Sequence, residues 1–186
     1  MKLFNKQLRE GFTLVELLVV IAVLGILATV ILVAVDPLEQ FARGRDASRK
    51  TVVGQLGRAL SAYYTSQTAT YPVQSAAWMN VIGPAPAGSG DIRTIPVNPN
   101  YAAGGPNCAA AAANQNNFCY VMNGANPPDA IVYLRLESRN EYAKCTNPAT
   151  MTPFFVWSST DGRAGLVCTI LPAAPGVGAQ TWNAKQ

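Results

Sequence analysis

Apolar residues form one nearly continuous run at the start of the chain, from Phe12 to Val35, and Glu16 is the only charged residue within it. The run has 24 residues, and about 20 apolar residues in a helix cross the hydrocarbon core of a bilayer. Residues 12–35 are therefore predicted to form a transmembrane helix. The run is too long for the apolar core of an ordinary signal peptide, about 7–15 residues.

The hydrophobic period changes after this run. Apolar side chains then recur at steps of three and four residues, the spacing of one helix face: Leu38, Phe41, Val52, Val53, Leu56, Ala59, Leu60 and Tyr63. This spacing predicts an amphipathic continuation of the helix over residues 36–68. A kink is expected at Pro37, because proline lacks the backbone N–H donor and clashes with the preceding turn.

Loops and short strands are predicted for the remainder. Residues 69–116 show no regular period and are expected to form a variable loop. Four apolar runs bounded by turn residues predict an antiparallel sheet within 117–170, with strands at 118–122, 130–136, 154–157 and 165–170. Residues 171–186, rich in Pro, Ala and Gly, are expected to form a loose tail. A small sheet with one face on the long helix gives an α+β fold.

The apolar run also admits a plainer interpretation. It would serve as a simple signal anchor, or as a signal peptide removed near Ala28 or Ala34. Glu16 argues against this interpretation, because a carboxylate in a membrane helix costs up to about 2.5–3.5 kcal/mol and usually marks a function.

The residues around the start of the run are more specific. The sequence Arg-Glu-Gly-Phe-Thr-Leu-Val-Glu, residues 9–16, follows a short basic leader. It resembles the class III leader and N-terminal segment of type IV pilins and type II secretion pseudopilins. The segment 45–64, with its Ala-Leu-x-x-Tyr pattern, and Tyr71-Pro72 after it are also similar to these proteins.

The resemblance implies a leader of residues 1–11, cut between Gly11 and Phe12 by a prepilin peptidase, with methylation of the new N-terminus at Phe12. It also implies that Glu16 serves filament assembly, by neutralising the α-amine at Phe12 of a neighbouring subunit. Two charges that are each costly in lipid become acceptable as a pair. The alternative is a glutamate whose side chain reaches the cytoplasmic headgroups.

The cysteines indicate on which side of the membrane the head lies. Basic residues flank the apolar run on both sides, so the charge asymmetry barely decides the orientation. All four cysteines, Cys108, Cys119, Cys145 and Cys168, follow the run, and an even number in a small domain indicates two disulfides outside the cytoplasm. Of three possible pairings, Cys108–Cys119 and Cys145–Cys168 are preferred, since each closes a contiguous segment. Four free thiols are the alternative.

Composition offers no sign of chemistry on a substrate. The chain has no histidine, the commonest general base, and its acidic residues follow no catalytic or metal-binding spacing. No catalytic residue, metal site or cofactor is predicted; calcium near Asp161-Gly162 is a minority alternative. Loss of residues 1–11 removes three basic residues and Glu10, so the net charge falls from +4 to +2. No nucleic-acid motif accompanies that charge.

These features together predict a structural subunit of a type IV pilus-like filament and not an enzyme. The resemblance implies three partners: a prepilin peptidase, an inner-membrane assembly platform, and further copies or other pilin-like subunits. The protein would be anchored by one membrane pass with its head outside the cytoplasm, and would then enter an extracellular or envelope-spanning filament. The alternatives are a type II secretion pseudopilin and a membrane-anchored adhesin or binding module that never polymerises.

Overall fold

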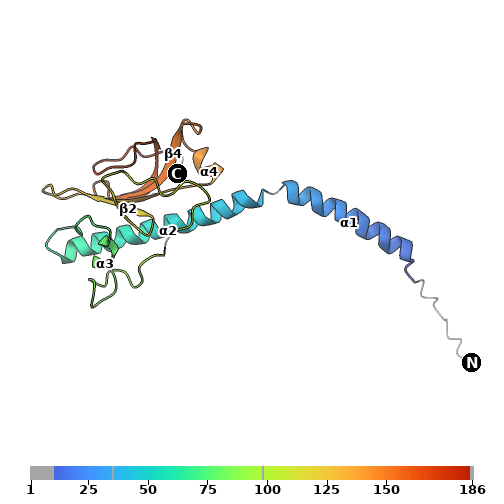
Figure 1. Cartoon of the computed structure of the whole chain (residues 1–186), viewed down its shortest axis with the longest axis horizontal. Helices are drawn as coiled ribbons and strands as arrows, with labels where there is room; N and C mark the ends of the chain where they lie inside the picture. Colours follow the sequence, from blue (N-terminus) through green and yellow to red (C-terminus); the bar gives the residue numbers. More distant parts are fainter. Residues whose placement is uncertain (1–10, 35, 98, 185–186) are drawn as a thin grey trace, which may run out of the picture. The chain divides into compact units, whose positions relative to one another are not determined.

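The computed structural model describes residues 11–34, 36–97 and 99–184. The chain divides after Leu38 into two compact units, which we describe separately. The first contains helix α1, Leu14–Ala34. The second, the head, contains most of helix α2, Pro37–Ser66, two short helices and a five-stranded sheet (Figure 1). The α+β class predicted from the sequence is confirmed.

Pro37 begins a new helix. The expected single helix with a kink is therefore replaced by α1 and α2, which end at Ala34 and begin at Pro37. Proline suits the first helical position, where its missing N–H would have no partner. The carboxylate of Asp36 accepts the backbone N–H of Leu38 at 3.2 Å, as an N-cap residue does. Asp-Pro is thus a helix start signal here.

The sheet is an antiparallel meander in the order β1-β2-β3-β4-β5. Its strands are Ala113–Gln115 (β1), Phe118–Met122 (β2), Ala130–Arg135 (β3), Met151–Ser158 (β4) and Arg163–Ile170 (β5). The four expected strands are present, but β1 adds a fifth and the sheet begins at 113 instead of 117. The sequence of β1, Ala-Asn-Gln, has no apolar alternation that could have revealed it. The two short helices are α3, Trp78–Val81, and α4, Arg139–Tyr142.

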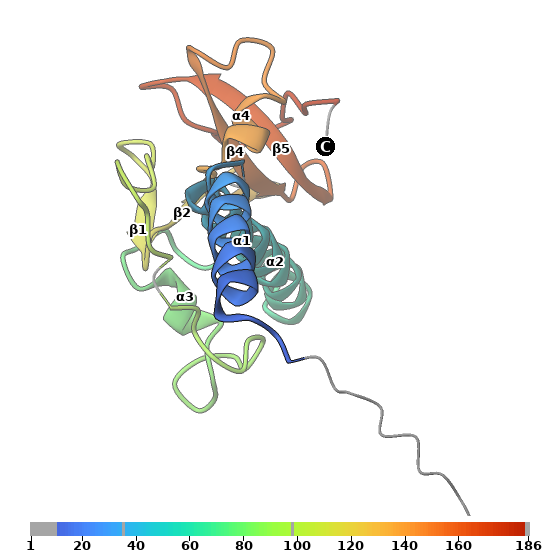
Figure 2. The same cartoon turned by 90° about the vertical axis from the view of Figure 1, so that its right-hand side faces the viewer.

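The two faces of the sheet belong to different apolar clusters. Alternate residues of β3 illustrate this: Val132 and Leu134 join the cluster that includes α2, whereas Ile131 and Tyr133 join the opposite one. Side chains of a strand alternate between faces, so both faces of this sheet are covered. Figure 2 shows α2 beneath the sheet, with α3 beside β1.

The long loop before β1 contributes large side chains to the core. Trp78 is fully buried and its ring stacks on that of Tyr120, with 4.4 Å between the ring centroids. A disulfide between Cys108 and Cys119 fixes the end of this loop to β2. A second disulfide, Cys145–Cys168, joins the segment after α4 to β5. This is the pairing preferred from the sequence.

Gly57 allows α2 to approach the sheet closely. A Cβ atom built at this glycine would lie 2.3 Å from Cδ1 of Trp157, an almost fully buried side chain on β4. A residue with a side chain therefore cannot occupy position 57 unless the indole moves. Glycine destabilises a helix interior, and at position 57 the close contact between helix and sheet offsets this cost.

Asp46 links α2 to the connection between β3 and α4. Its carboxylate accepts the backbone N–H groups of Glu137 and Ser138 at 2.8–3.0 Å. It also pairs with Arg49 on the next turn of α2, with 2.8 Å between nitrogen and oxygen. Both side chains of this pair are at least 97% buried. Removing one partner of such a pair costs about 3–5 kcal/mol.

Glu137 extends this network to a third segment. Its carboxylate pairs with Arg45 at 3.0 Å and with Arg49 at 3.1 Å, and it accepts the backbone N–H of Ala102 at 2.9 Å. The network therefore holds α2, the loop before β1 and the end of β3 together.

The C-terminal segment is packed on the sheet, and the expectation of a loose tail is wrong for residues 171–184. Trp182 forms a β-bridge with Val167 of β5, and its ring belongs to the cluster on the face opposite α2. The backbone N–H of Asn183 donates to the carbonyl oxygen of Leu166 at 2.8 Å. The segment's Pro, Ala and Gly content predicts a loose tail, but the packing of one large aromatic side chain, Trp182, orders it.

Substitution of Gly57 tests the close approach of α2. We expect Gly57→Ala to lower the free energy of unfolding by about 1–3 kcal/mol through overpacking against Trp157. Gly44→Ala is the matched control, because nothing lies within 4 Å of the added Cβ; it should raise that free energy by about 0.5–1 kcal/mol. Urea unfolding of the full chain in detergent, followed by tryptophan fluorescence, measures both. A Gly57→Ala protein as stable as the unmodified chain would contradict the packing described.

The carboxylates of the head should make its stability depend on pH. Burial alone would raise the pKa of Glu137, but the hydrogen bond from Arg45 and the charge of Arg49 outweigh it and hold the pKa below its ordinary 4.5. Burial would likewise raise the pKa of Glu141, but hydrogen bonds from Lys50 and Lys144 outweigh it and lower this pKa too. A lowered pKa in the folded state stabilises the fold above the ordinary value, and this contribution is lost as pH falls below it.

We therefore expect the urea midpoint of the head to fall steeply below pH 4.5, the ordinary pKa of both groups. Glu137→Gln should lower the urea midpoint at about pH 7. The decrease in the midpoint between that pH and about pH 3 should then be smaller than in the unmodified chain. Asp91→Asn, outside the network, is the control and should keep the acid dependence of the unmodified chain. Equal acid dependence in all three proteins would show that the Glu137 network does not carry the effect.

Candidate assembly site

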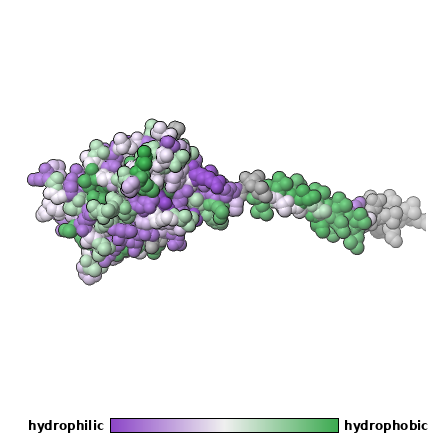
Figure 3. All heavy atoms as spheres, turned by 45° about the horizontal axis from the view of Figure 1, so that its top comes forward, coloured by the Kyte–Doolittle hydropathy of each residue, from purple (hydrophilic) through white to green (hydrophobic). Residues whose placement is uncertain are grey.

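Helix α1 presents apolar side chains around its whole circumference. Its large apolar side chains between Leu14 and Leu32 are 47–82% exposed within the chain. The stretch Leu14–Leu32 is long and apolar enough to cross a membrane. At 1.5 Å per residue, the 21 residues of α1 extend about 32 Å, close to the thickness of a hydrocarbon core. Figure 3 shows one side of α1, on which hydrophobic residues predominate.

Glu16 and Thr13 cap the start of α1. The Glu16 carboxylate accepts the backbone N–H of Thr13 at 2.9 Å and its hydroxyl at 2.8 Å. The Thr13 hydroxyl oxygen accepts the backbone N–H of Glu16 at 3.3 Å. This reciprocal arrangement is a capping box, which satisfies backbone donors that a helix N-terminus leaves unpaired.

The sequence contained a sign of this cap that our sequence analysis missed. A threonine followed three residues later by glutamate, just before an apolar run, is the signature of a capping box. The cap also fixes the position of the Glu16 carboxylate in the candidate site. The Glu16 carboxylate lies beside the first peptide group after Phe12, so an amine exposed at Phe12 would be created close to it.

The other predicted residues of this region are less defined. Gly11 and Phe12 precede α1, and the Phe12 side chain is 82% exposed. The rest of the expected leader, residues 1–10, lies outside the described residues. The cleavage and methylation expected at Gly11 and Phe12 thus remain predictions at this point.

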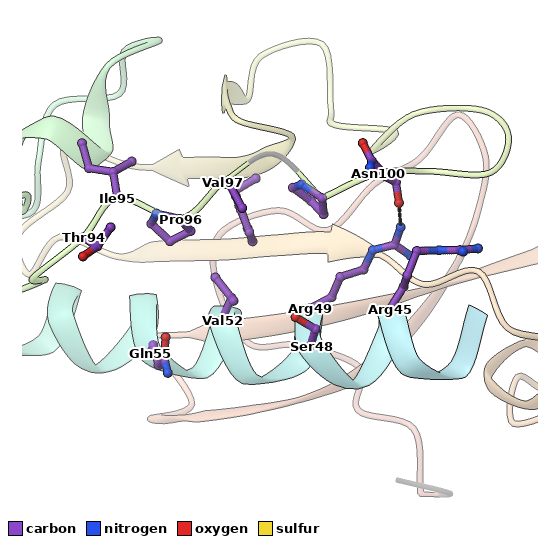
Figure 4. A pocket seen from close by; sticks show the side chains of 12 residues that line it. Arg45, Ser48, Arg49, Val52, Gln55, Thr94, Ile95, Pro96, Val97 and Asn100 are labelled. Atoms are coloured by element: carbon purple, nitrogen blue, oxygen red, sulfur yellow. Dashed lines mark hydrogen bonds between the residues drawn. The ribbon is translucent and has the colours of Figure 1, made fainter. Parts of the chain in front are cut away.

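A hollow of about 480 Å³ lies on the head between α2 and the loop before β1 (Figure 4). Its walls are mostly apolar, from Val52 on α2, Ile95 and Pro96 on the loop, and Phe118 at the start of β2. Arg49 closes one end, where its guanidinium donates to the carbonyl oxygen of Asn100. No local pattern predicts this hollow, because Val52 on one side and Ile95 on the other are far apart in the chain.

The turn considered for calcium has another role in the structure. The carboxylate of Asp161 accepts the backbone N–H of Gln180 at 3.0 Å and so anchors the C-terminal segment. Among residues 11–34, 36–97 and 99–184, no group of three or more histidine, cysteine or acidic side chains is arranged to hold a metal ion.

Comparisons with known proteins agree with the geometry at the N-terminus. Residues 6–32 match the family model described as the prokaryotic N-terminal methylation motif. The chain is 27% identical over 162 residues to the fimbrial protein EcpC of Eikenella corrodens, an alignment that covers 80% of this chain and 97% of the relative. No solved structure matches the chain significantly.

The motif lies on the segment that contains Gly11, Phe12, Thr13 and Glu16, and the similarity to the fimbrial protein extends well beyond it into the head. The order of an exposed apolar helix, a second helix and an antiparallel sheet is that of a pilin. The chain thus carries the prokaryotic N-terminal methylation motif at its start, consistent with a type IV pilin-like leader, and resembles a fimbrial protein over most of its length.

Proposed function

We propose that this chain is the structural subunit of a type IV pilus-like filament. The observation that carries the proposal is α1, a helix of membrane length with exposed apolar side chains on every side and a single carboxylate at its start. Such a helix has no polar face for contact with water. It needs a bilayer before assembly and the apolar helices of other subunits afterwards.

In this proposal a prepilin peptidase cuts between Gly11 and Phe12 and the new amine of Phe12 is methylated. The Glu16 carboxylate then pairs with the amine at Phe12 of a neighbouring subunit. Its present contact is with Thr13, only one residue from that position. The pairing would place each incoming helix in a defined axial register, because a mismatch leaves an unpaired charge among apolar side chains.

The partners follow from this route. The subunit would meet the peptidase and an inner-membrane assembly platform while α1 is in the bilayer, and then its own copies or other pilin-like subunits in the filament. The head would lie outside the cytoplasm throughout, where its two disulfides are stable. The filament would be extracellular or would span the envelope.

The similarity to a fimbrial protein favours a pilus over a type II secretion pseudopilus. Deletion of the gene in the native host separates the two functions. Loss of surface filaments with normal protein secretion supports the pilus, whereas loss of secretion supports the pseudopilus. Processed chains that never polymerise would instead support a membrane-anchored binding module.

The mass of the mature protein tests the processing step. We expect the protein purified from its native host to lack the first eleven residues, to carry one methyl group on Phe12, and to be four hydrogens lighter from its two disulfides. Intact-protein mass spectrometry with N-terminal fragmentation measures all three. A native protein that still begins at Met1 would exclude the proposed assembly.

Substitution of Glu16 tests the charge pairing separately from the helix cap. Glu16→Ala and Glu16→Gln should both be processed and inserted normally and should both fail to form filaments. Glutamine can keep the capping box with Thr13 but has no charge for the neighbour's amine. Electron microscopy of sheared surface material and immunoblots of processing measure the outcome. Filaments from Glu16→Gln would show that the cap, and not the charge, is what assembly requires.

A further inference from the structure

The first turns of α2 stay close to the surface of any membrane that α1 crosses. Helix α1 ends at Ala34 and α2 begins at Pro37. Three residues of chain span at most about 10 Å, and the helix from Pro37 to Phe41 adds about 6 Å. The backbone of Phe41 therefore lies within about 16 Å of the end of α1, whatever the angle between the helices. The headgroup layer is about 5–7 Å thick on each side of the hydrocarbon core.

Large apolar side chains are exposed on these first turns. The side chain of Leu38 is 76% exposed and that of Phe41 is 66% exposed. The large apolar side chains on the rest of α2 are buried or half-buried, among them Val53, Leu56 and Leu60. Exposed apolar surface that is confined to one place marks a contact site. The short chain to α1 indicates that the bilayer interface is what this site contacts.

The charged residues around this end of the head have their cations turned outward. Arg43 is 50% exposed, whereas its partner Glu39 is 12% exposed. Arg45 is 35% exposed, and its partner Glu137 is 7% exposed. The Glu39 carboxylate also accepts the backbone N–H of Arg139 at the start of α4. The acids thus face the head and the guanidinium groups face solvent. Figure 3 shows strongly hydrophilic residues gathered over the end of the head where α2 begins.

The combination of an exposed aromatic ring with outward arginines suits an anionic lipid surface. Phe and Leu side chains enter the boundary between headgroups and acyl chains, and Arg side chains beside them reach the phosphates. Each Lys or Arg close to an anionic surface strengthens binding about fivefold. The fold itself gains little from the pair of Arg43 with Glu39, because half-exposed ion pairs contribute little to stability.

We propose that this end of the head docks on the anionic phospholipid surface of the membrane that anchors α1, before the subunit enters a filament. The ring of Phe41 enters the headgroup boundary, and Arg43 and Arg45 contact phosphate groups. The inference rests on the membrane stage of the proposed function and not on the structure of the filament. Docking holds the head against the bilayer, and the withdrawal of α1 into a filament breaks this contact.

Spin labels on the full chain in lipid nanodiscs test the docking. A nitroxide on Gln40→Cys reports from the docking end, because Gln40 is exposed and the four native cysteines are paired. Ser66→Cys is the matched control, exposed at the opposite end of α2 and about 39 Å away along the helix. Power saturation with oxygen and a nickel chelate measures the immersion of each label. Discs of phosphatidylethanolamine with phosphatidylglycerol are compared with discs of phosphatidylcholine.

We expect the Gln40 label to be at least about fivefold less accessible to the nickel chelate in the anionic discs, and the Ser66 label to be equally accessible in both. Arg43→Glu and Phe41→Ser should each abolish the difference. Arg58→Glu, the same charge change at an exposed arginine further along α2, should preserve it. Urea unfolding checks that the head of each variant is folded.

The outcomes separate the docking from the proposed function. Equal accessibility of the Gln40 label in both kinds of disc overturns the docking and leaves the filament function intact. A difference that survives both Arg43→Glu and Phe41→Ser also overturns it, because proximity to the membrane alone would then explain the immersion. A chain that is not recovered with the discs on size-exclusion chromatography does not insert, which contradicts the docking and the proposed function together.

Discussion

The absence of a polar face on α1 is the constraint on which the rest of the described structure depends. An apolar helix of this length must have apolar surroundings, either lipid or the helices of other chains. Within the described chain the side chains of α1 are exposed, and the head has a core of its own. Helix α2 provides it, with apolar residues such as Leu56 and Leu60 on the sheet and charged residues elsewhere.

The head is held together by links of different chemical kinds. Gly57 brings α2 and Trp157 into direct contact. Asp46 and Glu137 tie the helix to backbone donors of distant segments, and two disulfides close the long irregular stretches. In the proposed filament, a subunit pulled along the axis would carry load through these links. Covalent bridges and buried ion pairs are suited to segments that contain little regular structure of their own.

Much of this structure follows from local pattern. The transmembrane run, the apolar face of α2 and the alternation along β3 depend on near neighbours in sequence, and so they were predictable. The contact between Glu16 and Thr13 is also local in the sequence, whereas the role of Glu16 in assembly stays a proposal. The close contact at Gly57 has no such local signal, because its partner Trp157 lies 100 residues away. The Asp46 network, the hollow and the docking of Trp182 likewise depend on contacts between distant segments, which no local window contains.

The docked C-terminal segment has a further consequence for crowded heads. The outer strand of a sheet offers unpaired backbone groups to any similar strand that approaches. On β5, the bridge to Trp182 and the hydrogen bond from Asn183 occupy part of that edge, while β1 at the opposite edge is only three residues long. In the proposed filament, heads at high local density could therefore touch without pairing their sheets edge to edge.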